Sequence, residues 1–128
     1  MIELEPIGRV RTDAAEVPRS WTISEVKGEL VIDQKYLEGI KSIHPGEKIV
    51  VIFHFHQSMP FTSTDLTQHP RGDLDRPKKG VFSLCSPFRP NPIGMSVLTV
   101  TAVKDNVIAV KSLDMIDGTP ILDIKPYR

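Results

Sequence analysis

The apolar positions of this chain fall into short runs that are separated by turn residues. The clearest run is Lys48–His56, in which a continuous apolar stretch gives way to alternation from Phe53 onward. Other runs are rich in β-branched residues and bounded by Gly, Pro, Asp or Asn, which is typical of strands. These are Ile2–Arg11, interrupted near Pro6 and Gly8, and Gly28–Ile32, Gly80–Ser83, Ser96–Lys104 and Val107–Leu113. The pair Asp105-Asn106 predicts a hairpin between the last two.

Helical patterns are scarce by comparison. Asp33–Ile40 fits one or two helical turns, with Asp33 as the cap and Tyr36, Leu37 and Ile40 on one face. Closely spaced strands with so little helix predict a mainly β fold. We expect a small single-domain β-barrel over residues 1–128, with long loops and at most one or two short helices.

Two segments lack a strand or helix pattern: Asp13–Val26, which holds the only tryptophan, Trp21, and Gln57–Lys79. Long loops in compact domains are more often functional than accidental. We therefore look for chemistry in these two segments.

Composition narrows the class of protein. The chain has 128 residues and a formal net charge of zero, so any polyanion site must be a local patch. Its single cysteine, Cys85, excludes an intrachain disulfide and suits a reducing cytoplasm. The acidic N-terminal sequence MIELEPIGRV does not resemble a signal peptide, and no run reaches the roughly 18 apolar residues of a membrane span. We expect a cytoplasmic protein without a membrane partner.

The stretch SPFRPNPIGMS, residues 86–96, is stiffened by three prolines. Each proline fixes φ near −65° and restricts the residue before it. Arg89-Pro90 and Asn91-Pro92 are two consecutive units of this kind, and they end at Gly94. The sequence predicts a rigid corner that presents one cation and one amide in set directions.

Histidine, cysteine and carboxylate side chains are the candidates for site chemistry. His54 and His56 share a strand face, but no metal-binding spacing occurs, so we expect no metal and a ligand-bonding role for His56-Gln57. Cys85 has no base nearby in sequence and is expected to be a small packing residue. The run Asp114–Pro120 is either only a turn or a pair of carboxylates that could hold a ribose or an amine. Glycine-rich phosphate loops are absent.

A cationic run crosses the long loop and reaches the rigid corner. Its members, Arg71, Arg76, Lys78, Lys79 and Arg89, are diluted only by Asp73 and Asp75. The run is either a solvated face or a polyanion contact. Phe61, Phe82 and Phe88 are interleaved with it, and an exposed one could stack on a base, although we expect Phe82 in the core.

Four motifs together resemble the TrmO family, whose members are tRNA N6-methyltransferases that act on threonylcarbamoyladenosine at position 37. They are GVFSLCSPFRPNPIGMS (Gly80–Ser96), FHFHQ (Phe53–Gln57), VPR (Val17–Arg19) and SLDMIDGTPILDIKPY (Ser112–Tyr127). The resemblance covers nearly the whole chain. It implies a β-barrel methyltransferase that uses S-adenosylmethionine and works as a homodimer. Because this cofactor has no phosphate, a glycine-rich phosphate loop is not needed.

The resemblance also implies site residues. The cofactor-binding set is Ser20, Trp21, Thr22, His56, Gln57, Cys85, Arg89, Asn91, Met95, Met115, Ile116, Asp117 and Gly118. Asp114 or Asp117 would accept a hydrogen bond from the reacting amine, and Arg71, Arg76, Lys78 and Lys79 would hold the RNA phosphates.

The chain departs from the family pattern at three places. Cys85 stands where the family commonly has an arginine, and Arg89 is the cation that could replace it. The segment after Val-Pro-Arg lacks the usual Gln-Pro-Gly, and the sequence stops at Arg128 without the C-terminal extension of larger members. An alternative is therefore an S-adenosylmethionine-binding paralogue with a small-molecule or protein substrate, or with a regulatory role and no catalysis.

Overall fold

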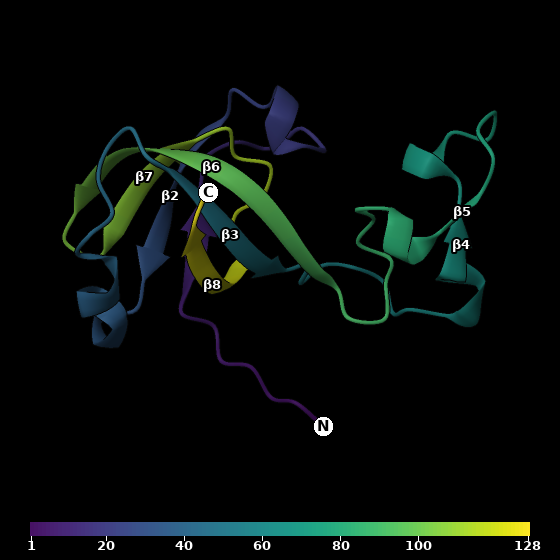
Figure 1. Cartoon of the computed structure of the whole chain (residues 1–128), viewed down its shortest axis with the longest axis horizontal. Coiled ribbons are helices and arrows are strands. Elements are labelled where there is room, and N and C mark those ends of the chain that lie inside the picture. Colours follow the sequence, from purple (N-terminus) through teal and green to yellow (C-terminus); the bar gives the residue numbers. More distant parts are fainter. The chain divides into compact units, whose positions relative to one another are not determined.

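The computed structural model describes all residues 1–128, and the chain forms two compact units. The first consists of Met1–His54 and Met95–Arg128, and the second of Phe55–Gly94. Most of the strand residues belong to the first unit, which is a closed barrel (Figure 1). The predicted mainly β barrel is confirmed. None of the helices combines the length and the apolar composition that a membrane span requires.

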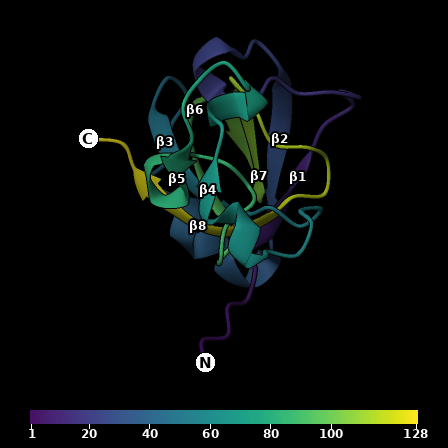
Figure 2. The ribbon, with the colours of Figure 1, turned by 90° about the vertical axis from the view of Figure 1, so that its right-hand side faces the viewer.

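Six strands form the barrel in the order β1-β2-β7-β6-β3-β8. Antiparallel ladders join β1 to β2 and β8, β2 to β7, β7 to β6, and β3 to β8 (Figure 2). Pairing of β6 with β3 completes the ring, so the barrel has no open edge. The strands are β1 (Gly8–Arg11), β2 (Lys27–Ile32), β3 (Lys48–His54), β6 (Ile93–Lys104), β7 (Val107–Lys111) and β8 (Pro120–Pro126).

The barrel is filled by side chains that alternate along its strands. In β3, Ile49, Val51 and Phe53 are buried, while the residues between them are only partly covered. The apolar run Lys48–His54 therefore follows the period of two that a pleated strand requires. The largest fully buried apolar side chains are Leu30, Ile32, Leu98, Ile108, Leu113 and Ile121. Their burial is the main term that stabilises the barrel.

The predicted hairpin between β6 and β7 is present. Asp105 takes the left-handed conformation with φ 52°, which a two-residue hairpin turn needs. The Nδ2 group of Asn106 donates to the Ile32 carbonyl at 2.7 Å, and the Ile32 N–H donates to the Asn106 carbonyl at 2.8 Å. The turn is thus bonded to the end of β2.

Near the ends of the chain, one predicted strand is too long and one observed strand has no prediction. The first strand begins at Gly8 and not at Ile2, because Ile2 and Leu4 have no partner strand and are 85% and 59% exposed. β8 was not predicted at all, since Pro120 and Pro126 mark its two ends. Prolines are tolerated at strand ends, where the missing N–H costs little.

The second unit holds only short elements, most of them in the segment Gln57–Lys79, for which the sequence predicts no strand or helix. They are η3 (Ser63–Leu66), β4 (Thr67–Gln68), η4 (Pro70–Gly72), β5 (Lys79–Gly80) and η5 (Val81–Ser83), where η denotes a 3₁₀ helix. β4 and β5 pair antiparallel. The predicted strand Gly80–Ser83 is wrong beyond Gly80, because the chain turns there into η5. In this unit only Pro70 and Val81 are buried.

The barrel unit carries two more 3₁₀ helices, η1 (Trp21–Ile23) and η2 (Gln34–Ile40). η2 lies where the short helix was predicted, and Ile40 is its buried residue. Asp33 occupies the N-cap position, but its side chain makes no capping hydrogen bond.

Candidate functional site

Asp114 joins three separate parts of the barrel unit. It lies in the connection between β7 and β8, and its Oδ1 accepts a 2.6 Å hydrogen bond from the Ser96 hydroxyl of β6. Its Oδ2 accepts a 2.8 Å hydrogen bond from the backbone N–H of Trp21 in η1. Ser96 is fully buried. Each carboxylate oxygen therefore already holds a protein donor.

The surroundings of Asp114 shift the pKa of its carboxyl group. Partial burial raises the pKa of Asp114, and the hydrogen bonds from Ser96 and Trp21 act in the opposite direction. These hydrogen bonds are the compensation for burying the carboxylate. We interpret Asp114 first as the residue that fixes η1 to the β7–β8 connection.

A second anchor holds the same segment. The Ser24 hydroxyl donates to the Leu113 carbonyl, and the Leu113 N–H donates to the Val26 carbonyl at 3.0 Å. The predicted cofactor residues Ser20, Trp21 and Thr22 are thus fixed beside Leu113-Asp114 while remaining at least partly exposed. A segment with no periodic pattern is ordered here by tertiary hydrogen bonds.

The run Ile116–Gly118 presents polar and main-chain groups next to this anchor. Asp117 is exposed, and its Oδ1 accepts from the Thr12 N–H at 3.0 Å, so its other oxygen is open to solvent. Gly118 adopts φ 83°, a left-handed conformation that favours glycine, and it is also exposed. Thr119 closes the turn by donating from its hydroxyl to the Ile116 carbonyl at 2.7 Å.

The two methionines of the predicted set differ in exposure. Met115 is 2% exposed, so its side chain is part of the core and only its main chain could contact a ligand. Met95 is 56% exposed and directly precedes Ser96, the partner of Asp114. Of these two side chains, only that of Met95 is available to a ligand.

The other predicted cofactor residues belong to the second unit. Arg89 donates from one terminal nitrogen to the carbonyls of Leu84 and Ser86, at 2.8 and 3.1 Å. These are the residues directly before and after Cys85, so the Arg89 side chain lies beside the Cys85 backbone. Its remaining N–H groups are left for other acceptors. Cys85 is exposed, so the expected packing role for it is wrong. Gln57 and Asn91 are exposed and His56 is partly buried.

The histidines do not assemble a metal site. No group of three or more His, Cys, Asp and Glu side chains is arranged to hold a metal ion. His44 pairs through Nδ1 with Glu47 at 3.2 Å, and the Nδ1 of His69 lies 2.8 Å from the Arg76 carbonyl.

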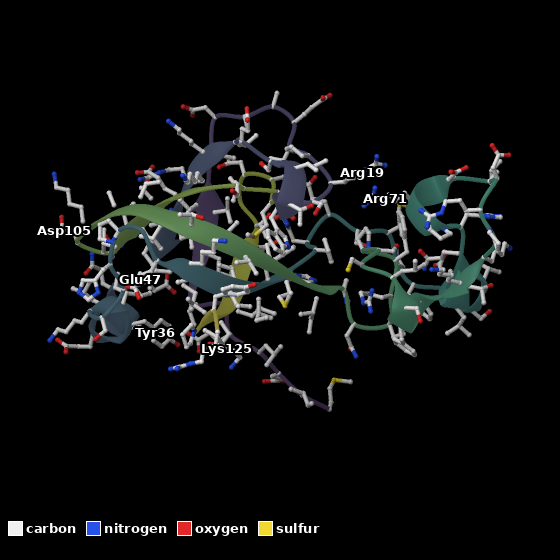
Figure 3. The ribbon with its side chains drawn as sticks, turned by 45° about the horizontal axis from the view of Figure 1, so that its top comes forward. Arg19, Tyr36, Glu47, Arg71, Asp105 and Lys125 are labelled. Atoms are coloured by element: carbon white, nitrogen blue, oxygen red, sulfur yellow. The ribbon has the colours of Figure 1, made fainter.

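The cations of the second unit are unpaired. All five salt bridges in the structure join residues of the barrel unit. By contrast, Arg71, Arg76, Lys78 and Lys79 are exposed and have no carboxylate partner (Figure 3, where Arg71 is labelled). Unpaired, solvated cations are available to phosphate groups.

A pocket of about 470 Å³ lies elsewhere in the barrel unit and contains none of the predicted site residues. It is formed by η2, the start of β3 and the end of β8, where Figure 3 labels Tyr36, Glu47 and Lys125. Its charged lining residues are Glu47, Lys48, Asp123 and Lys125, of which only Lys125 and Asp123 pair with each other, at 2.8 Å, and none of the four belongs to the predicted site. The pocket is therefore no part of the candidate site.

Three residues of the site were not predicted from sequence: Thr12, Ser24 and Ser96. Ser96 carried a usable signal, because a hydroxyl at a buried strand position needs a partner. Thr12 and Ser24 lie at the ends of a segment without a pattern, and nothing in their spacing indicates their partners.

Known proteins resemble this chain in sequence, and solved structures resemble it in fold. A probable S-adenosyl-L-methionine-binding protein of Pyrococcus abyssi is 34% identical over 99% of this chain and 68% of its own length. The tRNA (adenine(37)-N6)-methyltransferase of Escherichia coli is 36% identical over 98% of this chain and 57% of its own length. The crystal structure of TrmO from Pseudomonas aeruginosa matches with a TM-score of 0.77 and 27% identity, over all of this chain and 56% of that one.

The chain therefore spans little more than half of the solved TrmO chain and of the Escherichia coli enzyme. The family model of the tRNA-methyltransferase O N-terminal domain matches residues 10–128. This match confirms the resemblance seen in the four motifs, and the chain belongs to the TrmO family.

Proposed function

We propose that this protein binds S-adenosylmethionine on its barrel and transfers the methyl group to the N6 amine of a modified adenosine, threonylcarbamoyladenosine 37, in the tRNA anticodon loop. The observation that carries the proposal is the double hydrogen bond of Asp114, which holds η1 beside the β7–β8 connection. Two of the segments that the family resemblance assigns to the cofactor are thereby adjacent in one compact unit. The names of the relatives support both the cofactor and the reaction.

The residues at this place fit the chemistry of the cofactor. S-adenosylmethionine has an adenine, a ribose and an aminocarboxylate, but no phosphate to be held. The partly exposed Trp21 offers a stacking surface. The hydroxyls of Ser20 and Thr22, which are hydrogen-bonded to each other at 2.7 Å, have further donor and acceptor capacity, and the open oxygen of Asp117 is available either to the cofactor or to the reacting amine. At Gly118 the absence of a Cβ lets a ligand approach the main chain closely.

When bound, S-adenosylmethionine supplies an electrophilic methyl carbon. The protein residues orient the two reactants and exclude water, and such positioning supplies much of the rate. The adenine amine must lose a proton during or after methylation. Asp117 is the better acceptor for a hydrogen bond from this amine, because both oxygens of Asp114 hold protein donors.

His56, Gln57, Cys85, Arg89 and Asn91 are proposed as further cofactor contacts on the strength of the family motifs. Arg89 has spare N–H groups beside Cys85, which supports it as the cation that replaces the family arginine. The family resemblance also supports a homodimer and a cytoplasmic location.

The second unit is proposed to hold the RNA. Replacing Lys78 and Lys79 with Ala should weaken tRNA binding and flatten its salt dependence, because the variant lacks two cations that have no competing carboxylates. The slope of log K against log salt should fall by about 0.7 for each single-strand phosphate that the variant no longer neutralises. The measurement is tRNA binding by fluorescence anisotropy across a salt series.

The matched control replaces Lys104 and Lys111 with Ala, which removes the same charge from exposed positions of the barrel unit. Its slope should stay near that of the unaltered protein. Equal slopes for both double variants would contradict an RNA site on the second unit.

Methyl transfer itself is tested with labelled S-adenosylmethionine and tRNA from cells that lack this protein, followed by nucleoside mass spectrometry. We expect the label on the N6 of the modified adenosine. Cofactor binding without label in tRNA would instead support the paralogue with another acceptor or a regulatory role.

A further inference from the structure

Phe82 is the feature of the second unit that the proposed function does not use. The sequence predicted it in the core, and this is wrong, because its side chain is 78% exposed. Its neighbour Val81 is only 1% exposed and fixes η5 to the unit. The Leu84 N–H donates to the Val81 carbonyl at 3.1 Å and closes the same turn. An aromatic ring is thus held in solvent by an anchored main chain.

The charge around Phe82 favours an anionic partner. Residues Phe55–Gly94 hold five Lys and Arg against three Asp, a net charge of +2. Since the whole chain is neutral, the barrel unit carries −2. Two of the three carboxylates serve local turns: Asp65 accepts from the Thr62 N–H, and Asp73 accepts from the Asp75 N–H, each at 3.0 Å. Because these two carboxylates bind backbone N–H groups and form no salt bridge, the nearby Lys and Arg side chains have no carboxylate partner.

Phe82 also lies within reach of these cations. Lys79 is three residues earlier in the chain, and three residues span at most about 11 Å. Lys79 pairs with Gln68 in the β4–β5 ladder, so its position is fixed as well. A phosphate held by Lys78 or Lys79 would bring the bases of the same strand close to Phe82.

We propose that Phe82 is a stacking platform for an unpaired base of the bound RNA, next to cations that hold the RNA backbone. This inference rests on the proposed function, since it assigns the RNA contact of that reaction. Unstacked bases of loops commonly pack on aromatic side chains in this way. A second copy of this chain is the less suitable partner, because a symmetric contact would bring the unpaired cations of both copies together.

The test measures binding of a fluorescent anticodon stem-loop to the full chain for three substitutions. Phe82→Tyr keeps the ring, Phe82→Leu keeps an apolar side chain without a ring, and Phe82→Ala removes both. Stacking is worth about 1–3 kcal/mol for each base, so Phe82→Leu and Phe82→Ala should weaken binding about 5- to 150-fold. Phe82→Tyr should stay within about twofold. Leu74→Ala is the matched control, since Leu74 is 79% exposed in the same unit, and it should bind normally.

Equal affinity of Phe82→Leu and the unaltered protein would overturn the proposal. So would a variant that binds RNA normally but dissociates in sedimentation equilibrium, because Phe82 would then contact a second copy. RNA binding that depends on the ring, without methyl transfer, would remove the proposed reaction and leave this inference standing. Methyl transfer with unchanged RNA affinity in all three variants would support the proposed reaction and overturn the stacking role of Phe82.

Discussion

Replacing Asp114 with Ala is expected to lower the affinity for S-adenosylmethionine at least tenfold. The substitution leaves the buried Ser96 hydroxyl and the Trp21 N–H without an acceptor, and an unsatisfied buried group costs about 1–3 kcal/mol. The η1 segment is then held by the Ser24 anchor alone. Isothermal titration calorimetry gives the affinity, and the emission of Trp21 reports the segment directly, because Trp21 is the only tryptophan.

Asp114→Asn is the control that separates positioning from acid–base chemistry. An asparagine can still accept from the Trp21 N–H and can meet the Ser96 oxygen with its amide group. We therefore expect Asp114→Asn to keep the Trp21 emission, the cofactor affinity within a few-fold, and most of kcat. A variant with normal affinity and emission but no methyl transfer would show that Asp114 itself handles the proton. Unchanged affinity and emission in Asp114→Ala would remove the anchoring role.

Gly8→Ala should be the most destabilising small substitution in the barrel. A Cβ at Gly8 would lie 2.3 Å from the Val31 carbonyl oxygen and 2.9 Å from the Ile32 Cα. Both atoms are main chain in the β1–β2 ladder and cannot move independently, so the free energy of unfolding should fall by about 1–3 kcal/mol or more. Urea denaturation followed by far-UV circular dichroism measures it.

Gly39→Ala is the matched substitution, because a Cβ at Gly39 meets no atom within 4 Å. Alanine also has a higher helix propensity than glycine, so the free energy of unfolding should stay equal or rise by up to about 1 kcal/mol. If Gly8→Ala and Gly39→Ala unfold at the same urea concentration, the tight approach of β1 to β2 is not a constraint on the fold.

The strands that could be predicted are those in which local pattern and tertiary environment agree. Gly28–Ile32 and Val107–Leu113 are short apolar runs rich in β-branched residues and bounded by turn residues, and the strands found there, β2 and β7, bury alternate side chains. Asp105-Asn106 has the chemistry of a two-residue turn. β8 escaped prediction because its prolines indicate a boundary, whereas its pairing with β1 and β3 depends on closure of the whole barrel. Closure is a property of six strands together and leaves no local signal.

In the candidate site, too, residues with a local sequence signal could be predicted, whereas contacts between distant segments could not. The motif residues around Asp117-Gly118 could be singled out because an Asp-Gly pair is a recognisable turn signal, and the structure places Gly118 in the left-handed conformation with φ 83°. The partners of Asp114 could not, since Trp21 lies 93 positions away and Ser96 lies 18 positions away in the sequence. Phe82 was misplaced because hydrophobicity alone predicts burial, while its unit buries only Pro70 and Val81 and has no core to receive the ring.

The most direct test of a cofactor site on the barrel is calorimetric titration of S-adenosylmethionine into the unaltered chain and into Trp21→Ala and Tyr36→Ala. Trp21 lies on η1 beside Asp114, whereas Tyr36 lines the separate pocket near η2. We predict saturable binding that Trp21→Ala weakens at least tenfold and Tyr36→Ala leaves unchanged. Absence of binding, or binding that Tyr36→Ala abolishes and Trp21→Ala spares, would contradict a cofactor site at η1 and the β7–β8 connection.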